Sequence, residues 1–259
     1  MSFEWSCWRW QEVAPATTQQ QQAVDPAKND EAMALALAMV ASISNVFRLP
    51  TIQKSFMDHW TATAEKEAQI GDIMRHAPTD VKRVEKGTAD LGLRLVARFY
   101  QVESDYYSWS YERRMLRMSA PSINHLCKTL FFENTRFTGN SGDILDPQNS
   151  KYYAVIVQYV GKLNSAKLTN FVRALSNGTK KNFNLRVASE AESDEFTGYK
   201  SGGVTPFGMA KNVPVIVSKA ILDLRPPVLF LGAGHADWKV AVPVQEYLKA
   251  SKSFVVDLE

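Results

Sequence analysis

The sequence is poor in the side chains that build metal centres and disulfide frameworks. Only two cysteines occur in 259 residues, Cys7 and Cys127, and no metal-ligand spacing relates them. The four histidines are scattered and supply no second group of ligands. We therefore expect no metal site and no other cofactor, and we expect a reduced, cytoplasmic protein.

A strong charge of one sign is missing as well. The net charge is +3 and the pI is about 8.7. An excess this small permits a polyanionic partner but does not nominate one, because charge must be concentrated locally to steer binding. We expect no signal peptide, since Glu4 and Glu12 flank the only early basic residue, Arg9.

The sequence also lacks a long apolar run. Its most apolar stretch, residues 30–49, is interrupted by Ser42, Ser44 and Asn45. A membrane-spanning helix needs about 20 mostly apolar residues. We therefore expect no membrane span and no membrane partner.

Hydrophobic residues nevertheless make up 45% of the chain, which is enough for a full core. Residues 1–29 differ from the rest: Trp5, Trp8 and Trp10 precede a polar, Gln-rich tract without periodicity. Such a tract is typical of disorder. The tryptophans either fold back onto the protein or form a docking peptide for a partner.

Residues 30–77 read as a helical extension. The first helix should run from Asp30 to Leu49 and stop at Pro50. A second, over residues 52–76, places Ile52, Phe56, Trp60 and Ala64 at i+4 steps on one face. Such a hairpin either covers the main domain or offers a surface to a partner.

Residues 78–259 should form an α+β domain with a mixed β-sheet and surrounding helices. Strands and helices interleave without strict alternation, which argues against a purely parallel sheet. Strands are expected at 98–102, 127–133, 152–160, 185–188, 213–217, 228–234 and 238–242. Helices are expected at 79–91, at 165–176, and after a capping box formed by Ser189 and Glu192.

The stretch from Phe196 to Gly208 reads F-T-G-Y-K-S-G-G-V-T-P-F-G. Five of its thirteen residues are Gly or Pro, yet aromatic and aliphatic side chains lie between them. A flexible linker would lack those side chains. We therefore predict a shaped loop that another molecule can approach closely.

This loop, the following G-A-G, a Pro-started helix and a closing F-V-V-D-L together resemble the YbaK / prolyl-tRNA-synthetase-associated domain. Upstream, Lys128-Thr129 in H-L-C-K-T-L-F-F resembles the Lys-Thr strand of that family. The family edits mischarged tRNA, and the matches span residues 78–258. The resemblance implies a free-standing, trans-editing aminoacyl-tRNA deacylase, by default one that acts on tRNA(Pro) carrying Cys or Ala.

The resemblance also implies the site. Its catalytic residues would be Lys128 and the Gly-rich loop with Gly202, Gly203 and Pro206, whose backbone N–H groups can polarise an ester carbonyl. Substrate-binding residues would be Thr129, Val204, Thr205, Gly232, Ala233, Gly234, Tyr106 and Tyr107. From the residues alone, Lys128 is either a snorkelling edge lysine or a placed cation. Cys127 should face the core if Lys128 faces the site, because neighbouring strand residues point to opposite faces.

The sequence departs from the family in the pocket. Bacterial free-standing members look as if they carry Ser where Gly232 stands and a carboxylate where Lys239 stands, which leaves the amino-acid specificity open.

Lys180, Lys181 and Lys200 are the candidate tRNA-binding cations. The expected partners are tRNA and, through the N-terminal extension, an aminoacyl-tRNA synthetase or multi-synthetase complex. The alternative function is a non-catalytic tRNA-binding or scaffold subunit of such an assembly.

Overall fold

The computed structural model describes residues 34–35, 37–42, 45–58, 60, 64–137, 146–175 and 182–259. The Trp-rich segment predicted over residues 1–29 lies outside them. Contacts divide the chain between Ala38 and Met39, and the second unit, Met39–Glu259, contains the elements described below. None of the described helices is long and apolar enough to cross a membrane.

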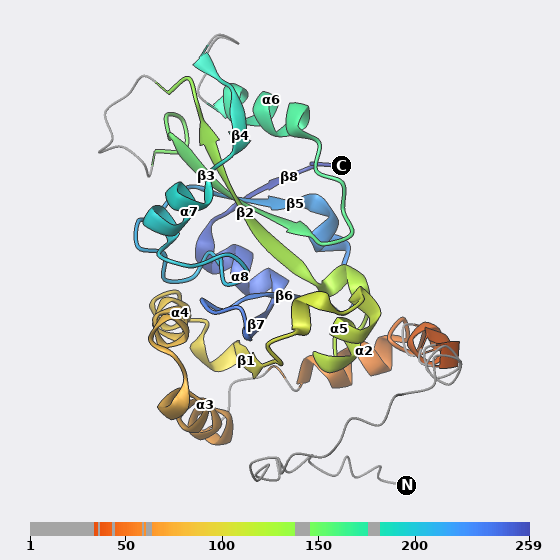
Figure 1. The fold of residues 1–259 in the computed structure, drawn as a ribbon. Coiled ribbons are helices and arrows are strands. Elements are labelled where there is room, and N and C mark those ends of the chain that lie inside the picture. The colour runs from red at the N-terminus through yellow and green to blue at the C-terminus, as the bar shows by residue number, and fades with distance from the viewer. Residues whose placement is uncertain are drawn as a thin grey trace, which may run out of the picture. The chain divides into compact units, whose positions relative to one another are not determined.

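A five-stranded sheet has the strand order β4-β2-β3-β5-β8 (Figure 1). Its strands are β2 (Cys127–Asn134), β3 (Tyr152–Gln158), β4 (Leu185–Val187), β5 (Val215–Ser218) and β8 (Phe254–Val256). β2 is antiparallel to β3 and β4, whereas β3–β5 and β5–β8 are parallel pairs. The prediction of a mixed sheet is confirmed.

A second, three-stranded antiparallel sheet has the order β1-β7-β6. It consists of β1 (Arg98–Gln101), β6 (Val228–Gly232) and β7 (Trp238–Pro243). A single parallel bridge between Leu126 and Phe230 connects β6 to the start of β2. The two sheets therefore meet where β2 begins, and this junction lies beside the site described below.

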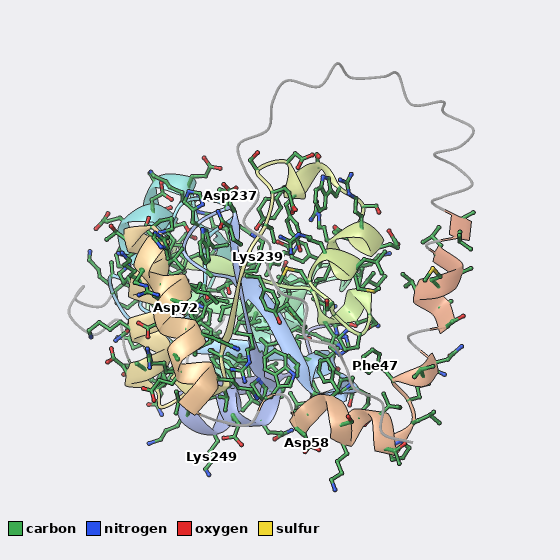
Figure 2. The ribbon with its side chains drawn as sticks, turned by 90° about the horizontal axis from the view of Figure 1, so that it is seen from below. Phe47, Asp58, Asp72, Asp237, Lys239 and Lys249 are labelled. Atoms are coloured by element: carbon green, nitrogen blue, oxygen red, sulfur yellow. The ribbon has the colours of Figure 1, made fainter. Side chains whose placement is uncertain are left out.

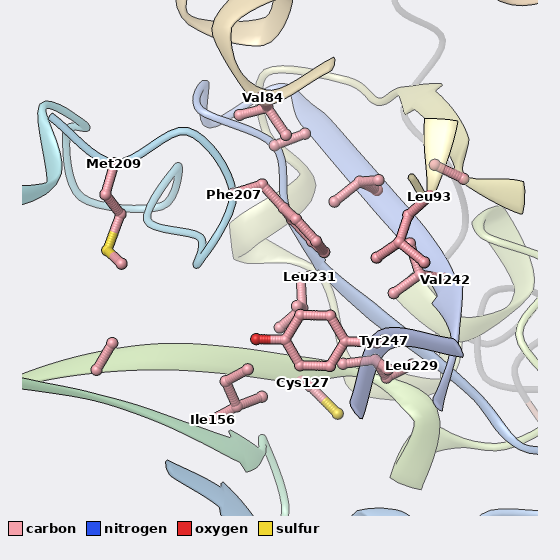
Figure 3. Close-up of a cluster of buried hydrophobic side chains, with 14 of the residues drawn as sticks. Val84, Leu93, Cys127, Ile156, Phe207, Met209, Leu229, Leu231, Val242 and Tyr247 are labelled. Atoms are coloured by element: carbon pink, nitrogen blue, oxygen red, sulfur yellow. The ribbon is translucent and has the colours of Figure 1, made fainter. Parts of the chain in front are cut away.

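Both faces of the larger sheet are buried. Along β3, Tyr153, Val155 and Val157 pack with helix α6 (Ser165–Leu175), while Tyr152, Ala154 and Ile156 face the main core. That core is closed by α4 (Thr79–Asp90), by α8 (Val244–Ser251) and by the smaller sheet. Figure 3 shows its centre, where Phe207 and Tyr247 lie between the sheets. Burial on both sides accounts for the nearly continuous apolar sequence of β3.

The remaining helices have local origins. α7 (Glu190–Thr197) begins with the predicted capping box: the Ser189 hydroxyl accepts from the Glu192 N–H, and the Glu192 carboxylate accepts from the Ser189 N–H. It ends at Gly198, whose φ is +71°. α5 (Tyr111–Arg117) begins after Ser110, whose hydroxyl accepts from the Arg113 N–H.

The helix predicted over residues 52–76 is wrong as one piece. The structure has two helices, α2 (Pro50–Asp58) and α3 (Ala64–His76). Pro50 begins α2 instead of ending the preceding helix, because a proline fits the first helical turn, where its missing N–H costs nothing. Trp60 lies between α2 and α3, and its ring packs edge-on against Phe230 at 6.5 Å.

Both helices pack on the cores of the main domain. Phe56 of α2 packs, with Trp60, in the cluster around Phe230, and Ile70 and Met74 of α3 belong to the main core. The domain boundary between residues 77 and 78 therefore stays a prediction, made from the range of the sequence resemblance. Physically, the helical extension completes the fold.

We predict that Trp60→Ala lowers the free energy of unfolding by about 3 kcal/mol or more, the usual loss for a buried Trp. Only 6% of Trp60 is exposed, so the substitution leaves a cavity against Phe230. Chemical denaturation measures the effect. The matched control is Leu49→Ala, because Leu49 is 52% exposed and should lose no more than about 0.5 kcal/mol. Equal, small losses in both variants would show that the helices do not complete the core.

Candidate functional site

A cleft of about 540 Å³ opens at the edge of β2. β4 pairs with β2 only from Phe132 to Asn134, so the edge of β2 from Lys128 to Leu130 is left without a strand partner on that side. We call this cavity the β2-edge cleft. Its lining residues are Tyr107, Lys128, Thr129, Leu130, Phe131, Tyr159, Val187, Ala188, Glu190, Ser193, Asp194, Ser201, Gly202, Val204 and Gly232.

Strand alternation separates Cys127 from Lys128 as predicted. Cys127 is buried in the main core, where Figure 3 shows it near Ile156, and burial raises the pKa of its thiol. Lys128 is half-buried, and its ammonium lies 5.5 Å from the centre of the Tyr159 ring. A neutral, inaccessible thiol is no nucleophile. Of the two neighbours, Lys128 is therefore the one that lines the cleft.

The Gly-rich loop reaches the cleft at Gly202 and Val204. Gly202 has φ +83°, and its carbonyl accepts a hydrogen bond of 2.6 Å from the Tyr107 hydroxyl. A Cβ at this position would lie 3.0 Å from Cε2 of Tyr107. Within the described part of the chain, no acceptor takes the N–H groups of Gly202 and Val204. Both residues line the cleft, so we take these N–H groups as candidate donors to a substrate oxygen.

Gly203 was expected to be a catalytic residue of the loop, and in the structure its backbone is held by two hydrogen bonds. Its N–H donates to the Lys200 carbonyl at 2.9 Å, and its carbonyl accepts from the Gly234 N–H at 2.8 Å. An added Cβ would lie only 2.5 Å from the Gly234 oxygen. Gly203 therefore lets two backbone segments touch, and its N–H is already used. It supports the loop without lining the cleft.

Only some of the other predicted site residues line the cleft. Thr129, Tyr107 and Gly232 line it, whereas Thr205, Pro206, Ala233, Gly234 and Tyr106 do not. Ala233 is in the main core, and Tyr106 is buried behind the cleft. Lys200 is exposed and pairs with Asp194 at 2.5 Å. Lys180 and Lys181 lie outside the described residues.

Several lining residues were missed from the sequence. Tyr159 follows β3 and brings an aromatic face to Lys128. Glu190, Ser193 and Asp194, at i, i+3 and i+4 of α7, bring two carboxyl groups to the lining of the cleft. The capping box predicted the helix. The i, i+3, i+4 spacing of these three polar residues was the signal in the sequence that could have identified the face of α7 toward the cleft.

Lys239 lies behind the cleft and is 5% exposed, on β7 opposite Gly232 (Figure 2). Its Nζ lies 4.7 Å from the ring centre of Tyr107 and 5.0 Å from that of Tyr106. Burial lowers the pKa of Lys239 to about 7. Two carbonyls, those of Ala236 and Trp238, accept from Nζ, which matches the two N–H groups of a neutral amine. Lys239 thus supports Tyr107, which in turn holds Gly202.

The lowered pKa of Lys239 predicts a pH dependence of stability. Above about pH 7 the folded protein gives up this proton, while the unfolded chain keeps it until about pH 10.4. Because the unfolded state then binds more protons, stability rises with pH in this window, by at most about 1.4 kcal/mol per pH unit. Lys239→Met should remove this rise while keeping the apolar stem. Denaturation of both proteins between about pH 7 and 9 checks it, and parallel pH profiles would contradict the assigned burial.

Comparison with known proteins agrees with this geometry. The sequence family described as the aminoacyl-tRNA editing domain matches residues 115–250, more than half of the chain. That range contains Lys128, the Gly202 loop and Gly232. A comparison with curated proteins gives no match.

Solved structures share the fold. One, described as a candidate trans-editing enzyme for prolyl tRNA synthetase, is 18% identical with a TM-score of 0.56, covering 71% of this chain and 98% of that one. A scaffold protein used for computational epitope grafting is 15% identical with a TM-score of 0.55, over 71% and 98% of the two chains. At these identities the likeness concerns the fold. Together with the family match over the cleft-forming residues, it shows that the chain belongs to the aminoacyl-tRNA editing domain family, as its resemblance to YbaK implied.

Proposed function

We propose that this chain is a free-standing aminoacyl-tRNA deacylase that hydrolyses the ester of mischarged tRNA in trans. One observation carries the proposal: Lys128 and Gly202, far apart in the sequence, line the same cleft. A cation and unpaired backbone donors are what an ester attached to a polyanion requires.

The reaction adds water to the ester carbonyl carbon and breaks the bond to the ribose oxygen. The amino acid leaves as a carboxylate, and the ribose oxygen takes a proton. We assign the stabilisation of the oxyanion that forms meanwhile to the N–H groups of Gly202 and Val204, two residues that line the cleft. The buried Cys127 is not used as a nucleophile. In the proposed mechanism water itself attacks the ester carbonyl carbon, assisted by hydroxyl groups of the substrate.

Lys128 supplies a point charge for the terminal phosphate or ribose. Its ammonium lies over the Tyr159 ring, 5.5 Å from the ring centre, and this contact limits where the ammonium can move. Lys200 lies at the exposed rim next to Asp194 and is available to the tRNA backbone. Lys180 and Lys181 remain predicted contacts.

The finer parts of the proposal rest on the family. The substrate by default is tRNA(Pro) carrying Cys or Ala, and the similar solved structure described as a candidate prolyl-tRNA-synthetase trans-editing enzyme supports that choice. The reaction would take place in the cytoplasm. Association with a synthetase through residues 1–77 is also proposed.

A panel of mischarged tRNAs tests the function. The purified chain should release the amino acid from at least one of them well above the spontaneous rate, with tRNA(Pro) carrying Ala or Cys as the first candidates. Tight tRNA binding without release from any substrate would instead favour a non-catalytic scaffold subunit.

A further inference from the structure

The lining of the β2-edge cleft includes two carboxyl groups that the proposed chemistry leaves unused. Glu190 and Asp194 line the cleft one turn apart on α7. The capping box fixes the first turn of this helix, so the two side chains share one face. Lys128 of β2 lines the same cleft, which therefore carries charges of both signs.

A second, independent observation lies on β2. Thr129 lines the same cleft and is only 7% exposed, yet its Oγ1 has no hydrogen-bond partner in the described part of the chain. Its side chain lies on the α7 side of β2, because Phe131, two residues further along that face, packs against Phe196 of α7 with ring centres 6.1 Å apart. A buried hydroxyl without a partner is costly unless a ligand satisfies it.

These groups suit an ammonium ion. Carboxylates and a hydroxyl oxygen all accept hydrogen bonds, and an R–NH₃⁺ group has three donors. Asp194 already binds one ammonium, that of Lys200, at 2.5 Å. Lys200 directly precedes Ser201 and Gly202, so the same ion pair keeps Asp194 beside the loop that receives the ester carbonyl.

We infer that Glu190, Asp194 and Thr129 form a subsite for the free α-ammonium group of the aminoacyl moiety. The inference rests on the proposed function, because only there is an ammonium attached to the carbon next to the ester carbonyl. It sets the substrate class: tRNA esters of amino acids with a free amino group are hydrolysed, and N-acylated or peptidyl esters are refused. An uncharged amide in its place offers the two carboxylates no charge to pair with, although Asp194 keeps its ion pair with Lys200.

The test compares two esters of one tRNA: the aminoacyl-tRNA that the chain hydrolyses fastest, and its N-acetyl derivative. Each enzymatic rate is divided by the spontaneous rate of the same ester, because acetylation alters intrinsic reactivity. The wild type should prefer the free amine by about 10–100-fold in kcat/KM, the range expected for a charged hydrogen bond. Asp194→Asn and Glu190→Gln should each narrow this preference, chiefly by raising KM for the free amine.

The matched control is Glu195→Gln on the same helix. Glu195 pairs with Lys211 and does not line the cleft, so its variant should keep the wild-type preference. Thr129→Val provides a second variant that removes only the hydroxyl. Equal normalised rates for the two esters, or an unchanged preference in the three cleft variants, would overturn the subsite while leaving deacylation intact. Hydrolysis of neither ester would overturn the proposed function itself.

Discussion

Replacing Lys128 by methionine should lower the rate of tRNA deacylation by about 10²-fold or more, the scale of one lost electrostatic contact to the transition state. Methionine keeps an apolar stem against Tyr159 and removes only the charge. The fold should survive, because a half-buried lysine at a strand edge adds little to stability. Single-turnover kinetics at saturating enzyme separate the chemical step from binding.

Two further variants complete this experiment. Lys128→Ala also removes the stem and should lose at least as much rate. Lys249→Ala removes an exposed lysine on α8, outside the cleft lining, and should leave the rate unchanged (Figure 2). A Lys128→Met protein with the wild-type rate and melting temperature would mean that Lys128 only snorkels at the strand edge.

Gly202→Ala should reduce the chemical step by about 10²-fold or more, because a methyl group at this position obstructs the approach of the ester carbonyl to the backbone donors. The added Cβ also meets Tyr107 at 3.0 Å and Ala236 at 3.4 Å, so the loop must shift. tRNA affinity should change little, since it depends on phosphate contacts made elsewhere.

Backbone strain in the Gly202→Ala variant could lower activity by itself, so the experiment needs a control for strain. Gly202 has φ +83°, which costs an alanine about 1–2 kcal/mol. Gly92 provides the match: its φ is +71°, and a Cβ there would meet nothing within 4 Å. Gly92→Ala should lose similar stability and no activity. If both alanines lose stability but neither loses rate, the loop is only a turn.

Much of the fold was predictable because its signals are local. β-branched and aromatic runs located the strands β1 to β7 but not β8, and a capping box located α7. Alternation along β2 correctly placed Cys127 in the core and Lys128 at the cleft. Gly and Pro marked the loop that reaches the site.

Other features depend on contacts that no local pattern contains. The i+4 spacing through Trp60 continued across a break in the helix, because Trp60 is positioned by Phe230 of β6 and not by its neighbours in sequence. Gly203 was expected to face substrate, but its backbone meets Gly234 from a distant turn. Tyr159 and the acidic face of α7 belong to the site only because the open edge of β2 brings them together.

If the cleft itself hydrolyses the ester, the chain alone must release the amino acid. The purified chain, without any synthetase, is mixed in excess with the best mischarged tRNA, and release of the amino acid is followed in a single turnover. We predict a first-order release whose rate constant saturates with enzyme concentration and falls by about 10²-fold in Lys128→Met. Release of the amino acid at the spontaneous rate, while the tRNA is fully bound, would show that the cleft does not hydrolyse the ester.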